Sequence, residues 1–266
     1  MAHARNANEV VVVTGAAGRI GSAVVPRLRR DGRALRLLDA AHPAEGRAGE
    51  WIRCALHDED ALRRACDGAH AVVHLAGIAS ETAWSDLMAV NIDGTRAVLE
   101  AARDGGVRSV MLASSVHAAG FESPPTDRPL PVAAARPDSY YGVSKAAMEA
   151  LGSVFADRFG MSVVSGRICT FLLAPERGRA EATWFSPDDA ARLCEAAIAL
   201  RDGRHHVVWG VSRNAPGWFD LVAGEAIGFA PEDDASVVLG HGPSTDLDAA
   251  EPIGGPSTRQ DHPLGG

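Results

Sequence analysis

A tyrosine and a lysine stand one helical turn apart in the middle of the chain. Tyr141 and Lys145 lie in the string YYGVSK, within a predicted helix, where positions i and i+4 share one face. Lys145 is the only lysine among the 26 Lys and Arg residues of the chain, so a charge that Arg could supply elsewhere has a special role here. A free phenol has a pKa near ~10, and a nearby cation lowers it toward neutrality. We therefore expect Tyr141 to act as a general base or acid and Lys145 to assist it. Tyr140 lies off that face.

Two serines end a predicted strand that precedes this helix. Ser114 and Ser115 follow the apolar run that begins at Arg108. Ligands of open α/β sheets gather at the carboxyl ends of the strands, where a hydroxyl could bind the reacting oxygen. Together, Ser115, Tyr141 and Lys145 suit the transfer of a proton to or from an alcohol.

A glycine pattern near the start of the chain predicts a dinucleotide site. Gly15, Gly18 and Gly21 stand between a predicted strand and a predicted helix, the context in which a backbone turn can approach a pyrophosphate. Asp39 closes the next strand, where a carboxylate binds both ribose hydroxyls and repels a 2′-phosphate. We therefore expect NAD rather than NADP.

The elements that carry these residues alternate along the chain. Apolar strands are predicted at 9–13, 34–38, 71–75, 108–113, 161–168 and 206–209, and helices after Gly21 and at 59–66, 86–103, 139–159 and 187–200. Uninterrupted apolar strands that alternate with helices predict an α/β fold, a Rossmann-type doubly wound parallel sheet with a small C-terminal substrate-binding region. The expected units are an N-terminal tail (1–8), an NAD-binding domain (9–169), a substrate-binding region with returning Rossmann elements (170–235) and an irregular tail (236–266).

Composition excludes several other classes of protein. The chain of 266 residues has a net charge of −8 and no dense basic patch, so we expect no nucleic-acid or membrane partner. The four cysteines are scattered without a Cys-x-x-Cys pair, and no third ligand accompanies His205 and His206, so we expect no metal. No signal peptide or membrane span is recognisable, and a cytoplasmic location is expected.

The chain resembles the extended short-chain dehydrogenase/reductase family, also described as NAD-dependent epimerases and dehydratases. The resemblance covers roughly residues 9–230 and is carried by TGAAGRIG, LLDA, VVHLAG, NIDGT, MLASSVHAAG and YYGVSK. It implies an NAD-dependent dehydrogenase in which Ser115, Tyr141 and Lys145 are catalytic, and in which Asn91 supports the site through backbone hydrogen bonds. The cofactor residues that it implies are Gly15, Gly18, Arg19, Ile20, Gly21, Asp39, Leu56, Leu75, Ala76, Gly77, Asn91, Tyr141, Lys145 and Ile168.

Within this family the chain is most similar to the uronate dehydrogenases, which oxidise a uronic acid at C1. The strings ARPDSYYGVSK, ATWFSPDD and HHVVWGVSRNAPGWFD carry this likeness. It implies that Arg179 binds a substrate carboxylate, that His117 lies beside the substrate, and that Thr170 supplies a hydroxyl. Val116 and Ala79 replace polar residues of these enzymes, which points to a less hydroxylated substrate. The substrate residues so implied are Ala79, Ser115, Val116, His117, Tyr141, Thr170 and Arg179.

Three functions remain open at this stage. The first is an NAD-dependent dehydrogenase acting on a small, carboxylated, uronate-type alcohol. The second is an epimerase or dehydratase that uses NAD transiently and accumulates no NADH. The third is a non-catalytic NAD-binding protein, against which the intact Ser115, Tyr141 and Lys145 argue. Because family members often pair through the helix of Tyr141, a homo-oligomer, dimer or higher, is expected.

Overall fold

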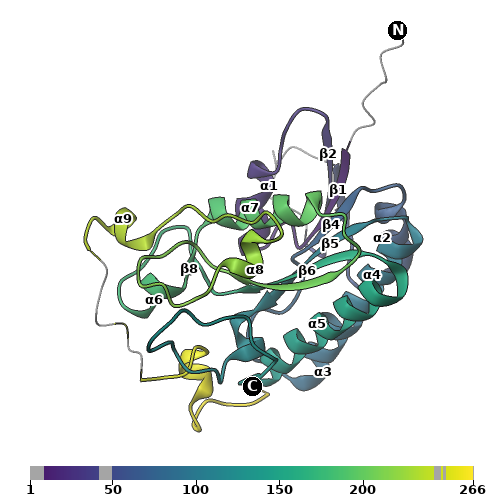
Figure 1. Ribbon diagram of the computed structural model, residues 1–266. Helices are drawn as coiled ribbons and strands as arrows, with labels where there is room; N and C mark the ends of the chain where they lie inside the picture. Colours follow the sequence, from purple (N-terminus) through teal and green to yellow (C-terminus); the bar gives the residue numbers. More distant parts are fainter. Residues whose placement is uncertain (1–8, 42–49, 243–246, 248–249, 266) are drawn as a thin grey trace.

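A parallel sheet flanked by helices forms the body of the protein (Figure 1). The computed structural model describes residues 9–41, 50–242, 247 and 250–265. In these residues the main sheet has seven strands in the order β3-β2-β1-β4-β5-β6-β9, all of them parallel. This order confirms the predicted Rossmann-type fold. The strands are β1 (Glu9–Thr14), β2 (Arg33–Asp39), β3 (Glu50–Arg53), β4 (Ala71–His74), β5 (Ser109–Ser115), β6 (Ser162–Ile168) and β9 (His205–Gly210).

Helices cover both faces of the sheet and bury its side chains. Helices α1 (Arg19–Arg27) and α7 (Pro187–Ala199) pack on one face, and α2 (Glu59–Cys66), α4 (Gly94–Asp104) and α5 (Tyr140–Phe159) pack on the other. Successive side chains of β1 alternate between the two layers, so that Val11 and Val13 join one core and Val12 joins the other. A strand buried on both faces is therefore apolar without interruption.

Capping residues set the ends of the helices that matter for the site. Ser139 caps α5 by accepting a hydrogen bond from the Gly142 amide at 3.0 Å, and Gly160 ends this helix in the left-handed region, with φ of 66°. Ser186 caps α7 through the Asp189 amide, and Pro187 occupies the first turn. Both starts agree with the predicted ones to within a residue.

The helix predicted at 86–103 is interrupted by a wider turn. Helix α3 (Trp84–Leu87) leads into a π-helical segment at Met88–Asp93, which continues as α4. The apolar spacing predicts the presence of this helix but not the extra residue in its middle. The edge strand β3 was not predicted, because its sequence, EWIR, has charged, exposed ends and no continuous apolar run.

A smaller lobe lies beyond the carboxyl ends of β5, β6 and β9. It contains β7 (Thr170–Phe171), α6 (Arg179–Thr183), β8 (Trp184–Phe185), α8 (Val222–Glu225) and α9 (Ala235–Leu239). Its core gathers Trp209, Trp218, Phe219 and Ile253. Residues 250–265 pack against the body of the protein and include a 3₁₀ turn at Gly255–Thr258. No helix in the described part of the chain is long and apolar enough to span a bilayer.

Candidate active site

The predicted dinucleotide loop joins β1 to α1 beside the point where the strand order reverses. Gly15 has φ of 67°, and a Cβ atom there would lie 2.6 Å from the Ala76 backbone nitrogen. A Cβ on Gly21 would overlap the Gly15 carbonyl oxygen, so helix α1 can approach the turn this closely only with glycine. This cradle fits the pyrophosphate of a dinucleotide, with the N-terminus of α1 facing it.

Asp39 is held next to this loop at the end of β2. Its two carboxylate oxygens accept hydrogen bonds from the Ala17 amide at 2.9 Å and from the Ala41 amide at 3.0 Å. Arg36, two residues earlier, points elsewhere and donates to the Ala65 and Asp67 carbonyls. The ribose end of the site therefore carries a fixed negative charge without a neighbouring cation from Arg36, which suits a ribose with a free 2′-hydroxyl.

Two adjoining cavities contain almost all of the predicted cofactor residues. The first, of about 660 Å³, is lined by Gly15, Gly18, Asp39, Leu56, Leu75, Ala76 and Gly77 among others. The second, of about 510 Å³, is lined by Arg19, Ile20, Leu75, Gly77, Tyr141, Lys145 and Ile168 among others. Leu75 and Gly77 belong to both, so together the cavities can hold the two ends of one extended cofactor. Gly21 and Asn91 are not among the lining residues; Asn91 is fully buried behind the loop.

The three residues that were predicted to be catalytic meet in the second cavity. Ser115, Tyr141 and Lys145 all line it. The Lys145 Nζ donates to the Ala113 carbonyl at 2.9 Å and lies 5.5 Å from the centre of the Tyr141 ring. The main-chain anchor on β5 holds the lysine on the same side as the phenol.

The electrostatics of this cluster differ from the simple expectation. Burial raises the pKa of Tyr141, a hydrogen bond with the Ser115 side chain lowers it, and the charge of Asp138 raises it further. Burial lowers the pKa of Lys145 to about 8. The expected lowering of the Tyr141 pKa is thus not found, because desolvation is the largest cause of its shift and raises the pKa.

Asn91 supports the loop over which the cofactor would lie. Its side chain exchanges hydrogen bonds with the backbone of Ile78 (2.8 and 3.0 Å) and donates to the Ser144 hydroxyl at 2.9 Å. A Cβ on Gly77 would lie 3.0 Å from the Asn91 Oδ1 and 3.6 Å from the Lys145 Nζ. The π-helical turn therefore brings Asn91 between the backbone of Ile78 and Ser144 of α5.

The predicted substrate residues surround the same cavity. Ala79, Ser115, Val116, His117, Tyr141, Thr170 and Arg179 all line it. The Thr170 hydroxyl bonds to the Thr183 hydroxyl at 2.7 Å. The Arg179 guanidinium lies 5.0 Å from the centre of the Trp218 ring. The chain thus brings a phenol, a hydroxyl and a guanidinium to one cavity, an arrangement that could bind an anionic alcohol.

Asp138 is a residue of the site that the sequence analysis missed. Its Oδ2 accepts a hydrogen bond at 2.8 Å from the His117 Nδ1, and its Oδ1 accepts one from the Ser139 hydroxyl at 2.8 Å. The His117 ring meets the Tyr141 ring edge-on, with the centres 5.6 Å apart. The aspartate directly precedes the cap of α5, so by sequence it resembles an ordinary helix-capping residue.

Two other contributions also come from distant parts of the chain. Glu81 accepts a hydrogen bond from the Tyr141 amide at 2.8 Å, and Ile253, Gly254, Gly255 and Pro256 line the second cavity. Neither has a recognisable motif, since a single glutamate and a Gly/Pro-rich segment have no characteristic spacing.

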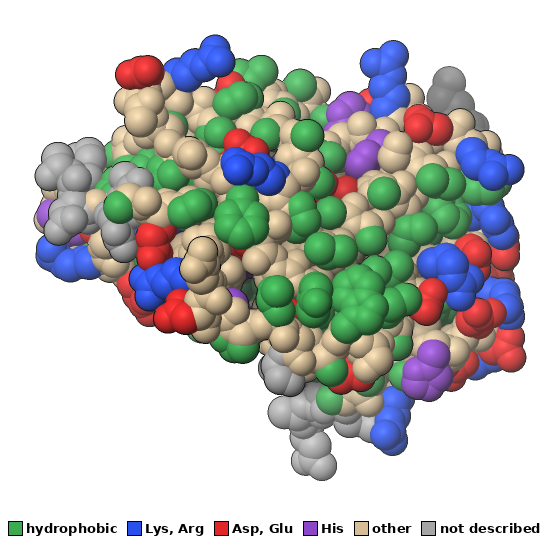
Figure 2. Space-filling view, turned by 90° about the horizontal axis from the view of Figure 1, so that it is seen from below, with side chains coloured by type: hydrophobic (Ala, Val, Ile, Leu, Met, Phe, Trp, Pro, Cys, Tyr) green, Lys and Arg blue, Asp and Glu red, His purple; other side chains and the backbone are tan. Residues whose placement is uncertain are grey.

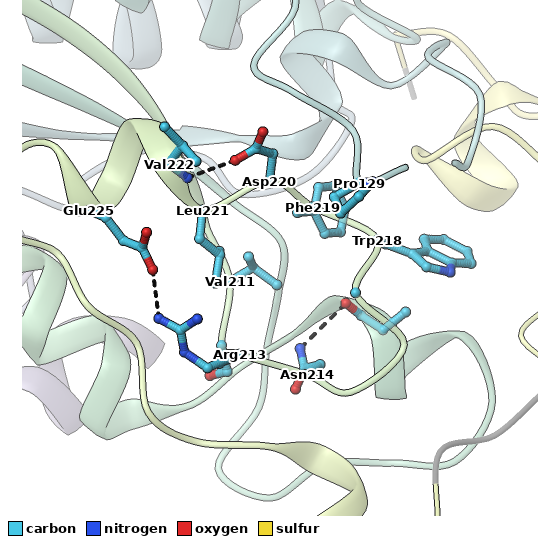
Figure 3. A pocket seen from close by; sticks show the side chains of 13 residues that line it. Pro129, Val211, Arg213, Asn214, Trp218, Phe219, Asp220, Leu221, Val222 and Glu225 are labelled. Atoms are coloured by element: carbon cyan, nitrogen blue, oxygen red, sulfur yellow. Dashed lines mark hydrogen bonds and ion pairs between the residues drawn. The ribbon is translucent and has the colours of Figure 1, made fainter. Parts of the chain in front are cut away.

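Another cavity lies in the small lobe, away from the catalytic residues. It measures about 390 Å³ and is bordered by Arg213, Trp218, Asp220 and Glu225 among others (Figure 3). Arg213 pairs with Glu225 at 2.8 Å, and the Asp220 carboxylate accepts from the Val222 amide at 2.7 Å. These polar groups bind one another, so we assign no ligand there. The described residues contain no group of three or more His, Cys, Asp or Glu that could hold a metal ion.

Comparison with known proteins agrees with this geometry. The family described as the NAD dependent epimerase/dehydratase family matches residues 11–215. A uronate dehydrogenase of Pseudomonas syringae pv. tomato is 38% identical over 85% of this chain and 83% of its own length.

Two solved structures show the same fold over nearly the whole chain. A glucuronic acid dehydrogenase from Chromohalobacter salexigens has a TM-score of 0.85 at 31% identity, over 96% of this chain and 98% of its own. A tyrosine-to-alanine mutant of uronate dehydrogenase from Agrobacterium tumefaciens, in complex with NAD, has a TM-score of 0.84 at 32% identity, over 96% and 99%.

Proposed function

The chain belongs to the NAD-dependent epimerase/dehydratase family, and from that premise we propose that it oxidises a free uronic acid at C1 to the corresponding lactone. The family, the dependence on NAD and the dehydrogenase class agree with the expectations from sequence. The observation that carries the choice of substrate is the presence of Arg179 in the same cavity as Ser115 and Tyr141.

The proposed chemistry removes a proton from one hydroxyl group and a hydride from the carbon that bears it. NAD, when bound, supplies the acceptor for the hydride from C1. Tyr141 takes the proton from the C1 hydroxyl at its Oη, while the Ser115 hydroxyl binds the same substrate oxygen. The C1–oxygen bond thereby becomes the carbonyl of a lactone. The two residues can act together because the end of β5 and the first turn of α5 bring them into one cavity.

Lys145 assists by placing a positive charge next to the phenol. With a pKa of about 8, its ammonium group is mostly protonated at neutral pH. It is anchored at the Ala113 carbonyl, so the charge stays next to Tyr141 through the reaction. Tyr141 accepts the proton as a phenolate, and this fixed cation stabilises the phenolate against the burial that raises its pKa.

Arg179 and its surroundings favour a carboxylated substrate. A guanidinium binds a carboxylate through two parallel hydrogen bonds, which suits the C6 carboxylate of a uronic acid. Val116 and Ala79 present apolar groups to the cavity, so fewer sugar hydroxyls are bound on that side. We propose that selectivity rests mainly on the carboxylate.

NADH formation tests this proposal. The purified protein is supplied with NAD and with glucuronate or galacturonate, and the absorbance of NADH is followed. We expect NADH to accumulate, and Tyr141→Phe to lower kcat by about 100-fold to 10,000-fold while NAD still binds. Product formation without NADH would favour the epimerase or dehydratase alternative. NAD binding without any turnover of the panel would contradict the proposed substrate.

We also propose that the protein acts as a homo-oligomer. Large apolar side chains are exposed along α3, the adjoining π-helical turn and α5; they are Trp84, Met88, Tyr140, Val143, Val154 and Phe159. Figure 2 shows hydrophobic side chains gathered on the face that lies below α3 and α5 in Figure 1. An apolar patch of this kind marks a protein–protein contact in soluble proteins.

A further inference from the structure

The C-terminal segment at 250–265 forms one wall of the catalytic cavity. Ile253, Gly254, Gly255 and Pro256 line it opposite residues that come from strands β4, β5 and β6 and the segments following them. The family model ends at residue 215, so this wall lies beyond the part of the chain that the model matches.

Backbone hydrogen bonds and packing hold the wall in place. The Ile253 amide donates to the Glu122 carbonyl and the Gly254 amide to the Gly120 carbonyl, both at 2.8 Å. Ile253 is 3% exposed and packs into the core of the small lobe. A Cβ on Gly254 would overlap the Asp138 carboxylate, so this close approach requires glycine.

The wall also fixes the arginine that faces the substrate. The Arg179 Nη2 donates to the Pro252 carbonyl at 2.5 Å, and its Nη1 approaches the Glu251 carbonyl at 3.5 Å. The plane of Trp218 supports the guanidinium from another side. The direction in which Arg179 presents its charge thus depends on two carbonyls of the C-terminal segment.

The far end of the segment reaches the N-terminus of α5. The Gly265 amide donates to the Glu81 Oε1 at 2.8 Å, and the Glu81 Oε2 accepts from the Tyr141 amide. The segment is therefore tied at one end to Arg179 and at the other, through one glutamate, to the backbone of Tyr141.

We propose that residues 250–265 determine substrate specificity, because they enclose the catalytic cavity and orient Arg179 toward the carboxylate of the substrate. This inference rests on the proposed function for the identity of the substrate. The wall itself is independent of that function. The probes are glucuronate and glucose, which differ at C6 by a carboxylate against a hydroxymethyl group.

The first test displaces the wall with Gly254→Val. We expect the ratio of kcat/KM for glucuronate to that for glucose to fall at least about tenfold, because the charged hydrogen bonds to the carboxylate are misplaced. NAD should still bind, because the cavity proposed for its pyrophosphate and the ribose at Asp39 is not lined by this segment. Gly242→Val is the matched control, since a Cβ there meets nothing within 4 Å. An unchanged ratio of the two kcat/KM values, in a variant whose wall is displaced, would overturn the proposal.

The second test measures how well the wall shields the cavity and does not depend on turnover. Cys169 lines the cavity and its thiol pKa is raised by burial, whereas Cys54 lines the other cavity and Cys66 and Cys194 are buried in the body. A neutral disulfide reagent should label Cys169 faster in Gly254→Val, and in a chain that ends at residue 249, than in the natural protein. The labelled peptide is identified by mass spectrometry. Equal labelling rates would show that residues 250–265 do not shield the cavity, whether or not uronates are substrates.

The two readouts separate the possible failures. If the natural protein oxidises no uronate, the proposed function fails and the selectivity for carboxylates fails with it, while the labelling still decides whether the wall exists. If Gly254→Val no longer binds NAD, it is misfolded, and Ile253→Ala replaces it in both measurements.

Discussion

Asp138 links His117, which lines the second cavity, to Ser139, the cap of α5. Its side chain is fully buried, and both carboxylate oxygens are engaged, one by the His117 ring and one by the Ser139 hydroxyl. A buried carboxylate with such partners fixes which face of the imidazole ring turns toward the cavity. Asp138 therefore positions His117 and also acts electrostatically on Tyr141.

The variant Asp138→Asn separates these two effects. Loss of the negative charge removes one of the causes that raise the Tyr141 pKa, so that pKa falls and the rise of kcat/KM with pH begins at a lower pH. Loss of a charged hydrogen bond to His117 should also lower kcat/KM about tenfold at its optimum. A pH profile measures both effects. Asp127→Asn, at an exposed position, is the control; a profile unchanged from the natural protein would contradict the coupling.

The sequence predicts site residues that lie together in a short motif and misses residues that reach the site only through tertiary contacts. Tyr141 and Lys145 share one helix face, so spacing alone brings them together. Asp138 and Glu81 reach the site because the chain folds back on itself: Glu81 bonds to an amide 60 positions away. No local pattern distinguishes such a carboxylate from a surface one.

His74 is placed by the strand and helix that it joins and not by a sequence motif. It lies at the end of β4, fully buried, and its ring bonds to the Thr14 hydroxyl of β1 at 2.7 Å and to the Thr95 hydroxyl of α4 at 3.1 Å. Burial, with a contribution from the Lys145 charge, lowers the His74 pKa to about 3. The imidazole therefore joins two elements while it stays neutral.

This neutral histidine makes the fold sensitive to acid. The unfolded chain binds a proton at His74 below pH ~6.5 and the folded chain does not, so stability decreases as pH falls from about 6.5 toward 3. At full difference the slope is about 1.4 kcal/mol per pH unit. Urea unfolding of the natural protein and His74→Asn, at several pH values below 6.5, should show a flatter dependence in the variant. Parallel curves would show that His74 becomes protonated in the fold.

The helix predicted from Asp86 to Arg103 contains a feature that apolar periodicity does not predict. The spacing of apolar residues predicts helix from Asp86 to Arg103, and the structure is helical throughout that range. The π turn within it adds a residue to one turn and thereby brings the Asn91 side chain within hydrogen-bonding distance of Ile78. The π turn therefore depends on a contact with a loop that lies outside the helix, which apolar spacing does not reveal.

Over the whole molecule, the doubly wound sheet was predictable because buried strands such as β1 and β4 contain continuous apolar runs and alternate with helical patterns. The C-terminal segment was not, because it has no periodicity and its place depends on single backbone bonds to Gly120 and Glu122. Such a Gly/Pro-rich segment is compatible with a disordered tail or with a packed wall. The choice between them depends on tertiary contacts.

The apolar face of α3 and α5 leads to a prediction for the assembly. If two copies pair through α5, a charge at Val154, which is 46% exposed on that helix, is buried without a partner and opposes association. Light scattering after size-exclusion chromatography should give a dimer or a higher oligomer for the natural protein and a smaller species for Val154→Glu, with NAD binding retained. Val237→Glu is the matched control, because Val237 is 76% exposed on α9 and away from this face. If the natural protein is monomeric at micromolar concentration, the proposed contact does not form. If Val154→Glu associates as the natural protein does, the contact lies elsewhere.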